Sequence, residues 1–172
     1  MRDNQWLNNR LEIIWKKHFK DVPRVNIVNI CFGKRARTRL GSIKQSAVGS
    51  RRLAVLNKAA NCKPQTASRI TITGYFRDEI VPEYVVDLVI AHELCHYAHG
   101  FCSPHPQLYD NPHKGKIIDK ELYKRGFGED IKKQKTWLKE SWPAIVGPHK
   151  QRRIIRKRKL STRSIIKLLF SS

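Results

Sequence analysis

Two histidines and a glutamate have a spacing that suits metal chemistry: His92, Glu93 and His96 form a His-Glu-x-x-His pattern. Residues four apart on a helix lie one above the other, about 6 Å apart along its axis. Two imidazoles placed in this way can both reach one zinc ion at roughly 2.0–2.1 Å. Glu93 lies about 100° further round the helix. There its carboxylate can hold a zinc-bound water and accept its proton, so we predict His92 and His96 as metal ligands and Glu93 as the catalytic base.

The segment before His92 predicts a buried helix. Residues 84–91 are almost wholly apolar, with Asp87 as their only charged member. A helix that is apolar on most faces is a buried one, and polar side chains at its end are costly unless something satisfies them. A bound metal does so. The alternative is a pair of core histidines that are hydrogen-bonded to the backbone.

A catalytic zinc takes three protein ligands and keeps one position for water, so a third ligand is required. His113 stands at the start of the next expected helix, 17 residues after His96. A loop of that length lets this helix cross beneath the first and direct its first turn at the metal, which favours His113. His99 would have to reach about 4.5 Å too far along the axis, so we expect it behind the ligands or exposed. The alternatives for the third ligand are His105, Glu121 and Asp119.

The charge of the chain points to a polyanionic partner. Among 172 residues, 35 are Lys or Arg and 14 are Asp or Glu, which gives a formal net charge of +21. Such an excess favours nucleic acid first and an anionic membrane second, over a surface that is merely soluble. A chain of this length predicts one domain with a tail.

The apolar and cysteine content predicts an intracellular protein. No run approaches 18 apolar residues and no signal peptide is recognisable, so we expect no transmembrane segment. None of the four cysteines forms a Cys-x-x-Cys pair, which favours free thiols in a reducing compartment. Cys95 is expected to be a small buried hydrophobe. The expected location is cytoplasmic or nucleoid-associated.

Hydrophobic periodicity predicts an α+β domain over residues 1–142. Apolar residues at helical spacing indicate an amphipathic N-terminal helix over residues 5–19. The central helix should begin near Pro82 and Glu83 and stop at a left-handed Gly100. Strands are expected at residues 25–32, 40–48 and 69–76, with a basic loop over 33–39 and either a strand or a loop over 51–57. Further helices are expected from Pro112, capped by Asn111, to Arg125, and over residues 130–141.

Residues 143–172 form a basic C-terminal tail. No acidic residue follows Ser141. We expect the tail to be a phosphate-binding arm, with a membrane-surface helix and a solvated end as alternatives. The predicted nucleic-acid-binding residues are Arg152, Arg153, Arg156, Lys157, Arg158 and Lys159.

The residues around the motif resemble a known family. The run VVDLVIAHELCHYAHG (residues 85–100), followed by NPHKGKIIDKELYKRGFG (residues 111–128), resembles the SprT-like metallopeptidases. Residues 37–42, Arg-Thr-Arg-Leu-Gly-Ser, are similar to that family's Arg-x-x-Gly segment before a strand. The resemblance covers roughly residues 5–128, and its His-Lys-Gly part at 113–115 is more discriminating than the widely shared His-Glu-x-x-His pattern.

The resemblance implies a minimal zincin-like fold: an N-terminal helix, a small sheet of three to four strands, the His-Glu-x-x-His helix and a following helix. It implies a zinc-dependent endopeptidase that holds one Zn²⁺ with His92, His96 and His113 and uses Glu93 as the base. Tyr97 and Tyr109 are candidates to stabilise the oxyanion, and a structural role is the alternative for each. The better-known relatives act on proteins bound or crosslinked to DNA, which the charge of +21 fits independently. The alternative is a nucleic-acid-binding protein with a structural or vestigial zinc site.

Overall fold

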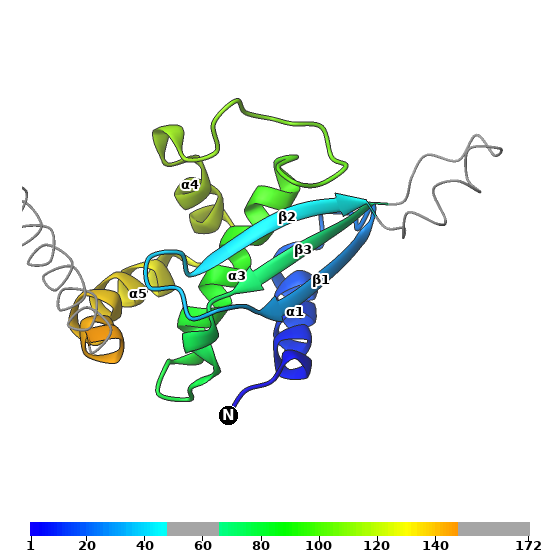
Figure 1. The fold of residues 1–172 in the computed structure, drawn as a ribbon. Coiled ribbons are helices and arrows are strands. Elements are labelled where there is room, and N and C mark those ends of the chain that lie inside the picture. Colours follow the sequence, from blue (N-terminus) through cyan, green and yellow to red (C-terminus); the bar gives the residue numbers. More distant parts are fainter. Residues whose placement is uncertain (48–65, 148–172) are drawn as a thin grey trace, which may run out of the picture. The chain divides into compact units, whose positions relative to one another are not determined.

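A three-stranded sheet with helices on one face positions the histidine helix (Figure 1). The computed structural model describes residues 1–47 and 66–147. Its strands have the order β1-β3-β2: β1 (Ile27–Phe32) pairs parallel with β3 (Thr66–Ile72), and β2 (Gly41–Ala47) pairs antiparallel with β3. The expected α+β class, with an N-terminal helix, a small sheet and several helices, is confirmed.

The N-terminal helix α1 (Asn4–His18) forms where its apolar residues repeat at helical spacing. Asp3 caps it by accepting a hydrogen bond from the backbone N–H of Trp6 at 2.8 Å. Its buried face packs against β1 and the central helix. The residues of that face are Leu7, Leu11, Ile14 and Trp15, followed by buried Phe19.

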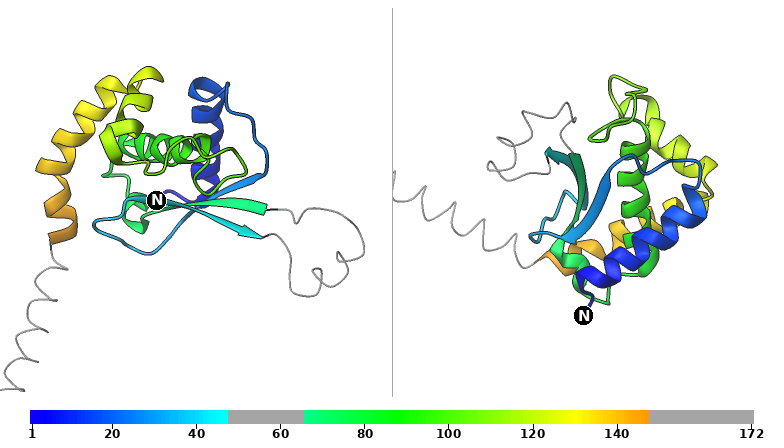
Figure 2. Two further views of the ribbon diagram at one scale, coloured as in Figure 1. Left: turned by 90° about the horizontal axis from the view of Figure 1, so that it is seen from above. Right: turned by 90° about the vertical axis from the view of Figure 1, so that its right-hand side faces the viewer.

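The central helix α3 (Glu83–Ala98) is buried on nearly all sides, as its sequence predicts. It follows Pro82 and ends where Gly100 takes the predicted left-handed backbone, with φ at 82°. It packs against β2, β3 and α1, and both α1 and α3 lie on the same face of the sheet (Figure 2). The metal-binding pattern is therefore carried by the most buried helix that the structure describes.

The third strand is displaced from its expected position. We predicted a strand over residues 69–76, but β3 ends at Ile72 and the 3-10 helix η2 (Gly74–Arg77) follows. Tyr75 and Phe76 are adjacent and both buried, which an alternating strand would not allow. At this point the chain instead binds the loop over 33–39, and the backbone N–H of Gly74 donates to the Lys34 carbonyl at 3.1 Å.

The helix after the loop begins later than expected. Instead of a helix from Pro112, a 3-10 turn η3 (Lys114–Lys116) precedes α4 (Ile117–Lys124). Gly115 and Lys116 have φ angles of 67° and 57°, and this left-handed backbone interrupts the helical hydrogen-bond ladder. Asn111 caps no helix there; its Oδ1 accepts from the His113 N–H at 3.1 Å within a turn.

The chain divides into two units, Met1–Lys132 and Lys133–Ser172, and α5 (Gly128–Glu140) contains the division. The boundary predicted after residue 142 stays a prediction. In the second unit, the rings of Trp137 and Trp142 are 6.0 Å apart. The possible strand over 51–57 and the predicted basic tail residues 152–159 lie outside the described residues. Within the described ranges, no helix has both the length and the apolar character needed to cross a bilayer.

Candidate metal centre

His113 lies 17 residues after His96 in the sequence, and it converges with His92 and His96 in the C-terminal half of α3. The ligand nitrogens of His92, His96 and His113 all lie within 4.8 Å of one another. His96 is buried, His92 is half-buried and His113 is exposed. The ring centroid of His113 is 5.7 Å from that of His92 and 4.9 Å from that of His96. Both imidazoles of the helix therefore share one site with the third histidine.

The separation of the two helical nitrogens suits a metal. The Nε2 atoms of His92 and His96 are 3.2 Å apart. Two nitrogen ligands at 2.0–2.1 Å from a tetrahedral ion would be separated by about 3.3 Å. Three neutral imidazoles are also a donor set that zinc accepts in open, catalytic sites. The residues present thus fit a metal ion.

The helical histidines are held in the form that binds metal. Burial is the main cause that lowers the pKa of His92 to about 4, and the charge of His113 adds to it, while Asp119 opposes it. Burial is also the main cause that lowers the pKa of His96 to about 4, and the charges of His92, His113 and His99 add to it. Both rings are therefore neutral at pH 7, which is the charge state in which an imidazole binds a metal.

His113 reaches the site from a turn and not from a helix, which corrects the expected geometry. It precedes η3, and the left-handed Gly115 separates it from α4. A Cβ at Gly115 would meet nothing within 4 Å, so glycine is required there for its backbone and not for space. The turn, rather than the first turn of the helix, therefore directs the His113 ring at the other two.

Glu93 is buried against the first residues of β2. A Cβ on Gly41 would lie 2.6 Å from Glu93 Oε1 and 2.7 Å from Val89 Cγ1, so only glycine allows this contact. Burial raises the pKa of Glu93 to about 7, opposed by a hydrogen bond from the backbone of Ile43 and by the charge of Arg39. Glu93 can thus both accept and donate a proton near neutral pH.

The alternative third ligands lie outside the cluster. The His105 Nε2 donates to the Pro23 carbonyl at 3.0 Å, and the His105 ring packs against Tyr97. Glu121 accepts from the Arg125 guanidinium at 2.9 Å. Asp119 acts on His92 through its charge. None of the three belongs to a group of potential ligands that the described residues bring together.

His99 is not exposed, which corrects one of the two expectations for it. Its side chain is 4% exposed and its ring centroid is 5.0 Å from that of Tyr109. Its Nδ1 has no hydrogen-bond partner in the described structure, and burial lowers its pKa. His99 therefore packs at the end of α3, outside the metal cluster.

The two tyrosines differ in what their hydroxyl groups can do. The Tyr97 hydroxyl donates to Asn26 Oδ1 at 2.9 Å and accepts from the Val25 N–H at 3.1 Å. Both hydrogen bonds go to the two residues before β1, so this hydroxyl is not available to stabilise an oxyanion. Tyr109 is 41% exposed, so its hydroxyl is not similarly enclosed.

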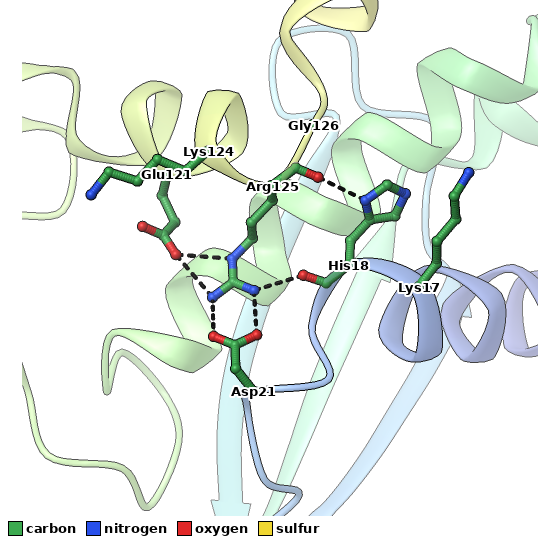
Figure 3. Close-up of a pocket in the computed structure, with 7 residues that line it drawn as sticks. All are labelled: Lys17, His18, Asp21, Glu121, Lys124, Arg125 and Gly126. Atoms are coloured by element: carbon green, nitrogen blue, oxygen red, sulfur yellow. Dashed lines mark hydrogen bonds and ion pairs between the residues drawn. The ribbon is translucent and has the colours of Figure 1, made fainter.

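An ion-pair network joins the end of α1 to the end of α4 (Figure 3). The Arg125 guanidinium donates to both carboxylate oxygens of Asp21 at 2.7 and 2.8 Å, to Glu121 and to the His18 carbonyl. The His18 ring binds the Arg125 carbonyl at 2.7 Å in return. These groups line a polar pocket, but every carboxylate in it is paired with Arg125. The network therefore holds α4 in place behind the His113 turn.

Sequence reasoning missed two features that shape the site. One is the contact between Gly41 and Glu93, for which the glycine in the segment at 37–42 was the available signal. The other is Arg39, whose charge acts on Glu93 although the two residues are 54 positions apart.

No family model, curated protein or solved structure matches this chain.

Proposed function

We propose that this protein is a zinc-dependent endopeptidase of the SprT-like kind. The observation that carries the proposal is the convergence of His92, His96 and His113 beside a buried glutamate. A structural zinc site closes the ion with four ligands, whereas only three ligands meet in the described residues. The sequence resemblance around residues 85–100 and 111–128 supports the same interpretation.

His92, His96 and His113 would hold the zinc through neutral ring nitrogens. When bound, zinc lowers the pKa of a coordinated water toward 7 and polarises the carbonyl of the scissile peptide bond. The remaining work is assigned to residues of this chain. The His96 ring is buried and the His92 ring is half-buried in α3, which strengthens the electrostatic interactions of both rings relative to bulk water.

Glu93 acts as the general base and then as the general acid. Its carboxylate accepts a proton from the attacking water and delivers it to the leaving amine as the peptide bond breaks. Burial raises the pKa of Glu93 to about 7 in the metal-free protein, so its carboxylate binds a proton more readily than a solvated carboxylate does. A hydrogen bond from the Ile43 backbone orients the carboxylate, and the absence of a side chain at Gly41 leaves room for it.

Replacing Glu93 by glutamine tests the peptidase. Zinc-loaded wild type should cleave casein, and Glu93→Gln should lose cleavage by roughly 10²-fold or more while retaining its zinc. Glu129→Gln is the matched control, because Glu129 is exposed and pairs with Lys132 at the surface. A chelator should abolish the wild-type activity. Cleavage by Glu93→Gln at the wild-type rate would refute the proposal.

The net charge of +21 supports substrates that are associated with DNA. A protein this cationic is attracted to phosphate chains, which would concentrate the peptidase where DNA-bound proteins are found. The same charge favours the second candidate, a nucleic-acid-binding protein whose zinc site is structural or vestigial. The casein assay separates them, because a structural zinc needs no carboxylate beside its first histidine and Glu93→Gln would then change nothing.

A further inference from the structure

Positive and negative residues are segregated along this chain. Between Asp21 and Asp78 there is no acidic residue, whereas this stretch contains twelve Lys and Arg. It includes all three strands of the sheet and the loop over residues 33–39. The 14 acidic residues therefore all lie outside the sheet, mostly on the helices. Of these cations, Lys44 and Arg69 lie on the strands and four more lie in the loop over residues 33–39, so the sheet and this loop carry positive charge with no carboxylate among their own residues.

The sheet presents one face that α1 and α3 do not cover (Figure 2). Lys44 and Arg69 are exposed on this face, on neighbouring strands and directly opposite each other. Like charges that are directly opposed on a sheet destabilise it. In the described part of the chain, neither side chain forms an ion pair with a carboxylate. This pair lacks a local anion that would offset its repulsion.

The loop over residues 33–39 extends the same charge to the end of the sheet. It carries Lys34, Arg35, Arg37 and Arg39 and no acidic residue. Thr73 holds it in place: the Thr73 Oγ1 donates to the Ala36 carbonyl at 2.8 Å and accepts from the Ala36 N–H at 3.0 Å. The loop leads directly into Gly41, which contacts Glu93. The cationic surface is thus continuous along the chain with the candidate active site.

We infer that the sheet face centred on Lys44 and Arg69, together with the loop over residues 33–39, binds a nucleic-acid duplex through its phosphates. The other outward positions of the strands are mostly hydroxyl and amide side chains, which donate hydrogen bonds to phosphate oxygens. These are Asn29, Ser42, Ser46 and Thr71. The inference rests on the proposed function only in that it brings DNA to the peptidase; the binding itself requires no catalysis.

The composition of the face distinguishes among polyanions. A membrane-binding surface inserts several apolar side chains into the lipid. Among the described strands, Ile27 is the only large aliphatic residue that is substantially exposed on this face, at 49%, so the face does not suit a membrane. Single strands are bound by aromatic side chains that stack on bases, and the outward strand positions in the described structure carry no aromatic residue. A duplex presents its phosphates outward and its bases inward, which matches a face that offers charge without stacking.

The test is the salt dependence of duplex binding by the full-length protein. The variant Lys34→Gln/Lys44→Gln/Arg69→Gln removes three charges from the face and its adjoining loop. The control Lys16→Gln/Lys20→Gln/Lys120→Gln removes three exposed charges from outside the sheet and loop. Affinity for a labelled DNA duplex is measured across salt concentrations. The salt slope is the slope of the logarithm of the affinity against the logarithm of the salt concentration, and removing one phosphate interaction should reduce its magnitude by about 0.9. At 0.1 M salt, the affinity of the first variant should fall by roughly 10²-fold.

The control should change the slope by less than one unit, because exposed charges more than about 10 Å from the duplex are screened. Equal losses in both variants, or none in the first, would overturn the inference. So would tighter binding of a single strand than of the duplex. A first variant that keeps its duplex affinity but no longer binds anionic lipid vesicles would assign the face to a membrane instead.

Two measurements separate this inference from the peptidase proposal. Duplex binding is repeated in the Glu93→Gln background, where the same loss is expected because the phosphates do not need the catalytic base. Cleavage of a DNA-free peptide is measured for the first variant, which should retain it. If the wild type cleaves nothing but the salt slopes of the wild type and the first variant still differ, the duplex inference stands and the peptidase proposal fails. If the wild type cleaves the peptide but the two slopes are equal, the peptidase proposal stands and the duplex inference fails.

Discussion

Gly41 and Glu93 face each other where β2 packs on α3, and no side chain fits between them. A Cβ at Gly41 would lie 2.6 Å from Glu93 Oε1 and 3.1 Å from its Cγ. These distances are shorter than van der Waals contact, so any larger residue at position 41 must move either the carboxylate or the helix. The position of the proposed general base therefore depends on a glycine in another element.

Gly41→Ala should impair both folding and catalysis. The added methyl group is expected to destabilise the protein by about 1–3 kcal/mol, because a well-packed interface tolerates extra volume poorly. Displacement of Glu93 should lower casein cleavage by more than tenfold even where the protein stays folded. Thermal unfolding and the cleavage rate are the measurements. The control is Ser42→Ala, one position further along β2 on its outer face, which should change neither the thermal stability nor the cleavage rate by much. Wild-type cleavage by Gly41→Ala would contradict the close approach of position 41 to Glu93.

His113→Ala should weaken metal binding far more than His105→Ala. His113 lies with its ligand nitrogen within 4.8 Å of those of the helical histidines, whereas His105 binds the Pro23 carbonyl. Loss of a ligand should exceed the roughly 10–100-fold loss that removal of a supporting residue causes. Zinc affinity measured by competition with a chelator decides this. The assignment fails if the two variants bind zinc equally well.

Glu93→Gln should remove a pH dependence from the stability of the metal-free protein. Burial raises the pKa of Glu93 from 4.5 to about 7, so the folded protein holds this proton more tightly than the unfolded chain. The resulting stability is complete below pH 4.5 and is lost as the pH rises through 7. The loss amounts to about 3 kcal/mol at pH 8, which glutamine does not incur.

The measurement is the difference in unfolding free energy between the two metal-free proteins from pH 4 to 8. His92 and His96 act in the opposite sense, because their lowered pKa values remove stability as the pH falls from 6.5 through 4. They are present in both proteins, so the difference isolates Glu93. A difference that stays constant across this range would show that Glu93 is not buried as described.

Arg125→Met should destabilise the first unit. The Arg125 side chain is 10% exposed and binds Asp21, Glu121 and the His18 carbonyl. Its loss leaves Glu121 and the His18 carbonyl without their donor, which should lower the free energy of unfolding by roughly 2 kcal/mol. This is less than the loss expected for a fully buried ion pair, because Asp21 stays solvated. Chemical denaturation measures this. The control is Lys132→Met, which breaks an exposed ion pair with Glu129 and should leave the free energy of unfolding unchanged within experimental error. If Lys132→Met loses as much stability as Arg125→Met, the buried network is not the stronger of the two.

Truncation after Gly147 should weaken DNA binding and flatten its salt dependence. The removed residues include the run of Arg and Lys at 152–159 that we predict as a phosphate-binding arm. The slope should fall by about 0.9 for every phosphate that the arm neutralises. Fluorescence anisotropy with a labelled duplex measures both quantities. An unchanged salt slope would mean that the tail neutralises no phosphates.

The sequence by itself determined what depends on neighbours along the chain. The spacing of His92 and His96 brings their rings together on any helix, and the apolar run before them already indicated that this helix is buried. The end of α3 at Gly100 and the buried face of α1 followed from the same local rules. These features were predicted correctly because their physical causes act within a few residues.

Only the tertiary structure decided how remote segments meet. Left-handed backbone at Gly115 and Lys116 directs His113 from a turn, although the sequence indicated a helix there. The end of β3 at Ile72 depends on the loop that packs beside it. The pKa of Glu93 depends on burial against a strand some fifty residues away. Periodicity reports the local preference of the backbone, whereas these outcomes arise from packing between segments that the chain order does not place side by side.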